Sequence, residues 1–181
     1  NEYACTTGFD VSSCGFTDAF SVAGQETSPT GLAFNTAGTK MFVSGIDGDA
    51  VHEYPCTTGF DLSSCTAVGV STFSVAGQET YPEGLAFNTD GTKMFVVGYA
   101  GQDVNEYACT TGFDVSSCGF TDAFSVAAQE TFPEGLAFNT DGTKMFVVGF
   151  AGEDVNEYTL SVAFDLNVPV AETETTTSSS D

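Results

Sequence analysis

The stretch that decides the fold runs from Tyr81 to Cys118, YPEGLAFNTDGTKMFVVGYAGQDVNEYACTTGFDVSSC, because close copies of it occur on both sides. One copy, FPEGLAFNTDGTKMFVVGFAGEDVNEY, begins at Phe132, and a more divergent copy, SPTGLAFNTAGTKMFVSG, begins at Ser28. The copies recur every 51 to 53 residues, as marked by the equivalent residues Tyr3, Tyr54, Tyr107 and Tyr158. A period of this length indicates stacked supersecondary units, none of which can bury its apolar face alone.

Within one repeat, the apolar pattern predicts four short strands. Residues 84–88 and 104–109 alternate apolar and polar side chains, residues 93–99 are apolar on both faces, and residues 123–126 carry Phe and Val on one face. Asp90-Gly91 separates the first two runs, which is a strong hairpin signal. No stretch shows helical periodicity. We therefore expect an all-β chain of tandem four-stranded antiparallel meanders over residues 1–171, about three and a half repeats.

The run P-E-G-L-A-F-N-T-D-G-T-K-M-F-V-V-G resembles the YVTN/NHL-type repeat of surface β-propellers. The resemblance implies that each repeat is a propeller blade and that Asp90-Gly91 and Asp141-Gly142 join its first two strands. The first copy departs from the pattern with Ala37-Gly38, and the cysteine-containing loop is longer than the usual turn. Because propellers close with at least four blades, the repeats predict an incomplete ring or an open array.

Six cysteines occur as three copies of the spacing C-x8-C. An even count at constant spacing predicts three disulfides within repeats, and hence an extracellular protein, secreted or at the cell surface. Each ten-residue loop closed in this way should stabilise the fold by roughly 2.5–3 kcal/mol. Zinc is the alternative, but zinc sites favour C-x2-C pairs. The predicted pairs are Cys5–Cys14, Cys56–Cys65 and Cys109–Cys118.

The charge of the chain is strongly one-sided, with 25 Asp and Glu against three Lys and a formal net charge of -22. Such a charge argues against nucleic acid, whose phosphates require clustered Lys and Arg, and against anionic membrane surfaces. No apolar run is long enough to predict membrane insertion. The last ten residues, 172–181, are rich in Thr and Ser and predict a disordered tail or linker.

Carboxylates are the one group of side chains that could carry chemistry. Glu79, Glu83, Glu130 and Glu134 flank a proline between repeats, and a second set crowds the turn before the third strand. Two interpretations stay open, namely solvated turns and weak sites for calcium, the one cofactor that these oxygen ligands would take. The metal candidates are Asp47, Asp49, Asp103, Glu153 and Asp154.

The sequence has few of the side chains that nucleophilic catalysis requires. His52 is the single histidine, and its equivalents in the other repeats are asparagines, which predicts a polar surface residue rather than a base. Because nearly every polar position is repeated, we expect no enzyme activity. The aromatic positions, including Phe20 and Phe73, fit core packing better than a glycan-stacking surface.

The predicted core lies between neighbouring sheets. Phe34, Phe87 and Phe138 should point into it, together with Leu32, Leu85 and Leu136 on the same strands and Phe42, Phe95 and Phe146 on the next. Unpaired strand edges at both ends predict self-assembly into a homo-oligomer or filament. The sequence thus predicts a non-enzymatic extracellular structural protein, a subunit of a fibre, sheath or surface layer. The alternative is a secreted propeller module for binding or adhesion to a glycan, cell surface or small ligand.

Overall fold

A computed structural model describes residues 1–167 and 171–172 of the 181-residue chain. These residues form one two-stranded and three four-stranded antiparallel sheets and contain no α-helix. The strands are β1 (Glu2–Cys5), β2 (Cys14–Asp18), β3 (Pro29–Phe34), β4 (Lys40–Gly45), β5 (Ala50–Pro55), β6 (Ser71–Ser74), β7 (Pro82–Phe87), β8 (Lys93–Gly98), β9 (Asp103–Cys109), β10 (Cys118–Ser125), β11 (Pro133–Phe138), β12 (Lys144–Gly149), β13 (Val155–Thr159) and β14 (Ala171–Glu172). Three short 3₁₀ turns lie in the cysteine loops, η1 (Val11–Ser13), η2 (Leu62–Ser64) and η3 (Val115–Ser117).

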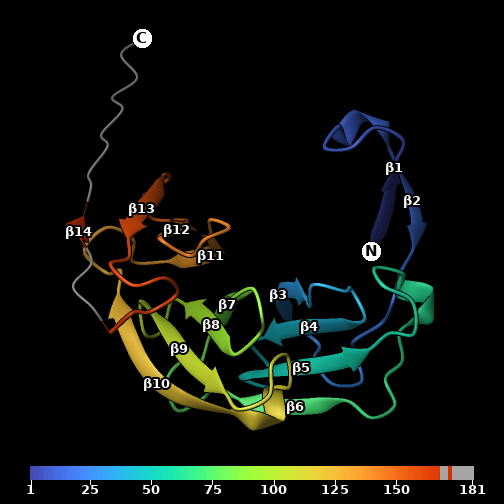
Figure 1. The fold of residues 1–181 in the computed structure, drawn as a ribbon, viewed down its shortest axis with the longest axis horizontal. Coiled ribbons are helices and arrows are strands. Elements are labelled where there is room, and N and C mark those ends of the chain that lie inside the picture. Colours follow the sequence, from blue (N-terminus) through green and yellow to red (C-terminus); the bar gives the residue numbers. More distant parts are fainter. Residues whose placement is uncertain (168–170, 173–181) are drawn as a thin grey trace.

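Each four-stranded sheet is one blade, and the blades follow one another around an open arc (Figure 1). We call β3–β6 the first blade, β7–β10 the second and β11–β14 the third; β1 and β2 form a separate hairpin at the N-terminal end of the arc. The strands β3, β7 and β11 lie on the concave side, and β6 and β10 lie outside (Figure 1). The predicted all-β fold of propeller-like blades is therefore confirmed. The predicted tail falls outside the described residues, apart from Glu172 in β14.

The turn between the first two strands of a blade follows from its Asp-Gly sequence. In the second blade, Asp90 Oδ1 accepts hydrogen bonds from the backbone N–H of Thr92 at 3.0 Å and from its hydroxyl at 2.6 Å. Gly91 has a φ of 73°, and a Cβ there would collide with the Phe113 ring. Only glycine meets both demands easily. This explains why the first blade keeps Gly38 although Ala37 replaces the aspartate.

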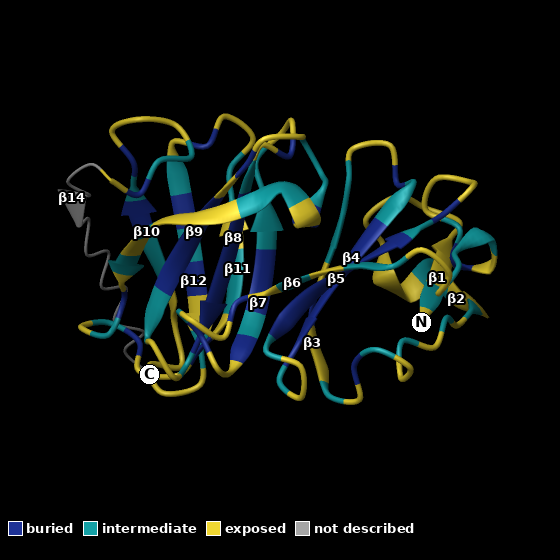
Figure 2. Cartoon of the chain, turned by 90° about the horizontal axis from the view of Figure 1, so that it is seen from below, coloured by how far each residue is buried: buried dark blue, intermediate teal, exposed yellow. Residues whose placement is uncertain are grey.

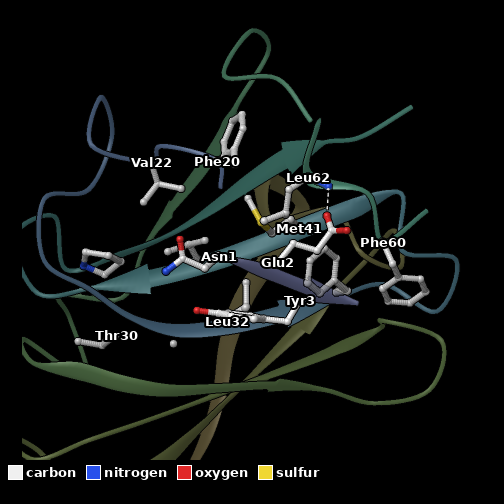
Figure 3. Close-up of a pocket in the computed structure, with 14 residues that line it drawn as sticks. Asn1, Glu2, Tyr3, Phe20, Val22, Thr30, Leu32, Met41, Phe60 and Leu62 are labelled. Carbon is white, nitrogen blue, oxygen red and sulfur yellow. Dashed lines mark hydrogen bonds between the residues drawn. The ribbon is translucent and has the colours of Figure 1, made fainter. Parts of the chain in front are cut away.

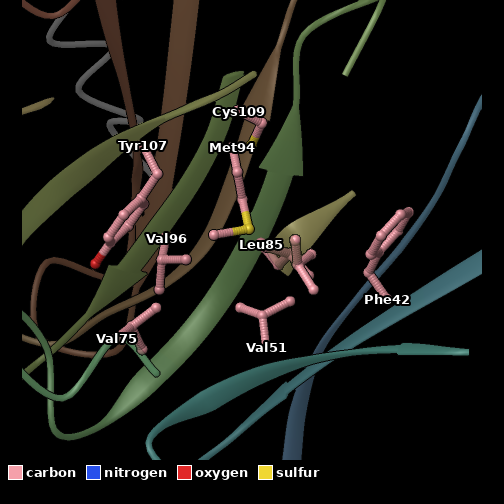
Figure 4. Packing of buried hydrophobic residues seen from close by; sticks show 9 residues of the cluster. Phe42, Val51, Val75, Leu85, Met94, Val96, Tyr107 and Cys109 are labelled. Carbon is pink, nitrogen blue, oxygen red and sulfur yellow. The ribbon is translucent and has the colours of Figure 1, made fainter. Parts of the chain in front are cut away.

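The strands of neighbouring blades are largely buried where the sheets face each other (Figure 2), and apolar side chains pack between them (Figure 4). Phe42 and Val51 from the first blade pack against Leu85, Met94 and Tyr107 of the second. Phe95 and Val104 in turn pack against the third blade. Each blade thus has a preceding face, toward the N-terminal neighbour, and a following face, toward the C-terminal one.

The predicted core residues take different positions in this packing. Phe42 and Phe95 are fully buried, whereas Phe34, Phe87 and Phe138 are half-buried and pack against the edges of the clusters. Leu32 contradicts the prediction, because it is 60% exposed where its equivalent Leu85 is 6% exposed. The reason is that no strand pair of the described residues covers the inner half of the first blade's preceding face.

Polar contacts connect each blade with the cysteine loop, or its equivalent, on the next blade. A glutamate on the third strand accepts the backbone N–H of the residue that begins the 3₁₀ turn of that loop, or of its equivalent Leu166 in the loop without cysteines. The same contact occurs three times, as Glu2–Leu62 at 2.8 Å, Glu53–Val115 at 3.1 Å and Glu106–Leu166 at 2.9 Å. The repeated contact fixes the rotation of one blade against the next.

Lysine completes the junction. Lys40 Nζ donates to the carbonyl of Phe113 at 2.6 Å and pairs with Glu53 Oε1 at 2.7 Å. Lys93 Nζ does the same with Phe164 at 2.7 Å and with Glu106 at 2.8 Å. The three lysines of the chain are thus used at one equivalent position, beside a glutamate of the same blade.

The three predicted disulfides are present, each closing the loop of its own repeat. In every loop an aspartate caps the 3₁₀ turn, for example Asp114, whose Oδ1 accepts from Ser116 N–H at 3.1 Å. The fourth loop contains Leu160 at the position of Cys109, and Leu160 and Leu166 are both buried there. Apolar packing therefore replaces the disulfide in the last repeat.

The packing predicts that Phe95→Ala lowers the free energy of unfolding by about 3–5 kcal/mol, since it opens a cavity between the second and third blades. Chemical denaturation of the purified chain measures this. Phe150→Ala is the matched control, because Phe150 is exposed, and its effect should stay within about 0.5 kcal/mol. Equal effects of the two substitutions would contradict the assigned core.

Candidate functional site

A buried glutamate holds the loops at one end of each blade. Glu79 lies two residues before Tyr81, and its carboxylate accepts the N–H groups of Tyr81 at 2.7 Å, Ala100 at 3.2 Å and Gly101 at 2.9 Å. Glu130 binds Phe132, Ala151 and Gly152 in the same way, at 2.7, 3.1 and 2.8 Å. Each glutamate therefore ties the segment before the innermost strand to the turn between the second and third strands.

The environment of Glu130 favours its charged form. Burial raises the pKa of this carboxyl, but the backbone N–H groups of Phe132, Gly152 and Ala151 outweigh burial and bring the pKa below its ordinary value of 4.5. The prediction that such glutamates are solvated is wrong for Glu79 and Glu130, which are fully buried. The sequence signal was the constant spacing between this glutamate, the aromatic residue and the Ala-Gly of the turn.

Three aromatic rings, from the segments that these glutamates bind, form a row. The rings of Tyr81 and Tyr99 have centroids 4.5 Å apart, and those of Tyr99 and Phe132 are 5.5 Å apart. All three are partly or largely exposed, and they come from segments that Glu79 and Glu130 hold. These rings were not among the aromatic positions assigned to the core, and they offer exposed apolar faces to a ligand.

Two glutamates lie at the second position of the innermost strands that follow these aromatic segments. Glu83 is on β7 and Glu134 is on β11, two strands that lie against each other on the concave side of the arc (Figure 1). Burial raises the pKa of Glu83, and the negative charges of Glu134 and Glu79 raise it further. The first blade has Thr30 at this position, and its hydroxyl donates to the carbonyl of Pro82 at 2.5 Å.

This arrangement makes Glu83 a weaker acid than an isolated carboxyl. Burial and the charges of Glu134 and Glu79 disfavour its ionised form, so Glu83 keeps its proton to a higher pH than an ordinary glutamate. A carboxyl that keeps its proton can act as a general acid, and a second carboxyl on the adjoining strand supplies a candidate general base. Tyr99 lies close enough for Glu83 to contribute to the raised pKa of its phenol, after burial and the neighbouring Tyr81.

The predicted metal candidates are held by other contacts. Asp103 accepts from Asn105 Nδ2 at 2.7 Å, Asp154 accepts from Asn156 Nδ2 at 3.0 Å, and Asp47 accepts from the Thr27 hydroxyl. Asp49 and Glu153 occupy turn positions with positive φ. Within the described residues, no group of three or more His, Cys, Asp or Glu side chains could hold a metal ion. Calcium binding by these residues stays a prediction.

His52 differs from the surface residue that the sequence predicted. It is buried on β5 opposite Val43, on the preceding face of the first blade. Its Nδ1 lies 3.0 Å from the Thr72 hydroxyl, and burial lowers its pKa, an effect that the charge of Glu26 partly reverses. Asparagine at the equivalent position is also buried, as Asn105 shows. The presence of Asn at the equivalent position of other repeats therefore did not indicate that the His52 side chain is exposed.

An apolar hollow of about 530 Å³ lies between the N-terminal hairpin and the first blade (Figure 3). Leu32, Met41, Phe20 and Val22 line it, and its one carboxylate, Glu2, is bonded to the backbone of Leu62. The hollow exposes the preceding face of the first blade and gathers no acid–base pair. The glutamate pair on β7 and β11 is thus the better candidate for chemistry.

Comparison with solved structures identifies the architecture. A putative 6-phosphogluconolactonase from Bacteroides fragilis superposes with a TM-score of 0.56 and 16% identity over 87% of this chain and 44% of that one. The periplasmic gluconolactonase of Pseudomonas aeruginosa gives 0.51 and 17% over 72% and 35%. A luciferin-regenerating enzyme gives 0.53 and 18% over 70% and 38%. The fold is of the β-propeller type.

The chain spans less than half of the length of each of these neighbours. At such identities the likeness shows the fold alone. No family model matches the chain, and no curated protein sequence matches it either. Within the described residues, no helix is long and apolar enough to cross a membrane. The disulfides, together with the periplasmic neighbour, indicate an oxidising location.

The comparisons contradict the predicted function class. The sequence predicted a structural protein, or else a binding module, and no enzyme activity, but the three neighbours described above are named as enzymes. Repetition of a polar residue does not by itself indicate a structural role. Successive blades around one axis bring equivalent positions together, so Glu83 and Glu134 become neighbours although 51 residues separate them in the chain.

The depressed pKa of Glu130 predicts a pH-dependent contribution to stability. A carboxylate whose pKa is lowered by folding stabilises the fold above its unfolded value of about 4.5, and this contribution disappears as the pH falls through the folded value. Glu130→Gln should therefore cost about 1.5–3 kcal/mol near neutral pH. The difference from wild type should shrink between about pH 6 and about pH 3.

Urea unfolding of Glu130→Gln and of the wild type, at about pH 6 and at about pH 3, measures this difference in stability. Glu153→Gln removes an exposed carboxylate from the adjoining turn, and it should change stability by less than about 0.5 kcal/mol at both pH values. A pH-independent cost for Glu130→Gln would show that the carboxylate charge has no part in holding the loops.

Proposed function

We propose that this chain supplies part of the active site of an enzyme that hydrolyses a ring ester, a sugar lactone being the substrate class that fits best. The carboxyl pair Glu83 and Glu134, with the raised pKa of Glu83, carries the proposal. Two of the enzymes that share the fold are named for gluconolactone or phosphogluconolactone. These names support the substrate class only by analogy of fold.

The proposed reaction needs only water and the two carboxyl groups. The ionised carboxylate takes a proton from water while the water oxygen attacks the lactone carbonyl carbon. The tetrahedral intermediate then collapses, and the bond between that carbon and the ring oxygen breaks. The protonated carboxyl gives its proton to the leaving ring oxygen, so the product is an open-chain hydroxy acid.

The aromatic row would orient the substrate. Tyr81, Tyr99 and Phe132 present exposed ring faces beside Glu83, and apolar faces of a sugar ring can lie on such surfaces. Glu79 and Glu130 act as positioning residues, since they hold the segments that carry the rings. The first blade lacks this equipment, because Ser28, Thr30 and Ile46 replace the aromatic and acidic residues.

The repeat pattern and the disulfides support an extracellular setting for this activity. The P-E-G-L-A-F…D-G-T-K-M-F-V-V-G sequence resembles the YVTN/NHL-type repeat of surface propellers, and the three disulfides require oxidising conditions. We therefore propose that the enzyme is secreted or lies at the cell surface.

The proposal predicts that the purified chain accelerates hydrolysis of glucono-1,5-lactone, measured as proton release in a pH-stat. Glu83→Gln and Glu134→Gln should each lower kcat/KM by about 10²–10⁴-fold, because each removes one partner of the acid–base pair. The rate should fall as the pH rises through the raised pKa of Glu83 and its proton is lost.

Glu153→Gln, an exposed substitution of the same type, should leave kcat/KM unchanged. Circular dichroism would confirm that all the variants are folded. A wild-type rate equal to that of buffer over a panel of five- and six-membered sugar lactones would refute the proposed activity. Full activity of Glu83→Gln would refute the proposed site.

A further inference from the structure

The two ends of the arc each carry one side of the contact that joins neighbouring blades, and neither side has its partner among the described residues. Inside the chain, the junction consists of a glutamate and a lysine from one blade and a cysteine-type loop from the next. In the third blade, Lys144 Nζ contacts Glu157 Oε1 at 2.6 Å, but among the described residues no following loop meets either side chain. The donor half of a junction therefore stands open at this end.

The N-terminal hairpin offers the matching loop. Its disulfide-closed loop has the same 3₁₀ turn, with Val11 at the position of Val115 and Phe9 at the position of Phe113. No acceptor for the Val11 N–H and no donor to the Phe9 carbonyl lies within residues 1–167. Val11 is 88% exposed, whereas Val115 is fully buried.

The apolar surfaces of the two ends match in the same way. Val155 on the following face of the third blade is 65% exposed, while its equivalents Val51 and Val104 are fully buried against the next blade. Tyr3 on the hairpin is 59% exposed, while its equivalents Tyr54 and Tyr107 are fully buried against the preceding one. Both ends thus expose residues whose equivalents are buried between blades inside the chain.

We propose that a second copy of this chain docks head to tail, with its N-terminal hairpin against the following face of the third blade. Glu157 of one copy accepts the Val11 N–H of the other, and Lys144 donates to the Phe9 carbonyl. Tyr3 packs against Val155 and the neighbouring Val148. The contact repeats what Glu53, Lys40 and Val51 make with the second blade inside one chain.

Several facts favour a second copy over an unrelated partner. The docking surface on the third blade is built from the same residue types that already bind this loop twice within the chain. Contacts of this head-to-tail kind need no two-fold self-complementarity, and they close a ring when the rotation per copy permits. The arc is open, with the hairpin and the third blade at its two ends (Figure 1), so one chain does not satisfy the contact by itself.

Electrostatics sets the conditions under which the contact forms. Two copies with a formal charge of -22 each repel one another, and salt screens this repulsion over a length of about 8–10 Å at physiological strength. Packing of Tyr3 on Val155 and Val148 supplies the apolar part of the contact, and screening leaves this packing intact, so added salt should strengthen the association. Sedimentation velocity over a range of concentrations, at about 0.05 M and about 0.5 M salt, measures the association.

Two substitutions test the surface from its two sides. Val155→Asp places a charge on the exposed following face of the third blade, where it does not disturb the fold of the single chain. Val11→Pro removes the N–H that Glu157 would bind. Proline is tolerated at the first position of such a turn, and the preceding Asp10, with φ -106° and ψ 97°, already has the extended conformation that a following proline favours.

The wild-type mass should rise above the monomer value of 18.8 kDa with concentration, more so at high salt. Each variant should weaken association by on the order of tenfold or more. Val68→Asp, which alters an exposed valine outside both surfaces, should associate like wild type. A mass of 18.8 kDa at all concentrations in both salts, or unchanged association of Val155→Asp, would overturn the proposal.

Discussion

The structure depends on one constraint, namely that each blade has two apolar faces and only another blade can cover them. Phe95 and Val104 on the following face of the second blade are fully buried because the third blade packs on them. The same sequence pattern gives an exposed Leu32 where no neighbouring strand pair lies. The free energy of this fold therefore comes mainly from the junctions between blades, as in other repeat arrays.

Polar contacts make these junctions specific. Glu106 is buried, so its two oxygens need partners, and they have them in Lys93 Nζ and the backbone of the next loop. A chain with 25 acidic residues and only three lysines uses each lysine at this position. Removing Lys93 would leave the buried Glu106 carboxylate without its cation, which costs more than an exposed ion pair contributes. The few cations of this acidic sequence therefore lie where a glutamate of the same blade needs a partner.

Periodicity predicted the fold well because it reports local alternation and turn chemistry. The run 93–99 corresponds to β8 (Lys93–Gly98), and the spacing C-x8-C corresponds to three disulfides within repeats. The burial of His52 and Glu79 could not be read in this way. His52 is buried by strand pairing and packing on the preceding face, and Glu79 is buried because distant backbone N–H groups converge on it. Such contacts depend on which segments meet in space, and alternation along one strand carries no information about that.

A residue that is repeated along the sequence can still contribute to a site, because equivalent positions of neighbouring blades lie close together in space. The innermost strands β7 and β11 lie side by side (Figure 1), so Glu83 and Glu134, which occupy equivalent positions of two repeats, come close enough to interact electrostatically. The first repeat differs at this position and so adds no third carboxyl to the pair. Thr30 replaces the glutamate in the first blade and uses its hydroxyl to bind the Pro82 carbonyl instead. The charge cluster therefore extends over the second and third blades and stops at the first, where a third carboxylate would have raised the electrostatic cost further.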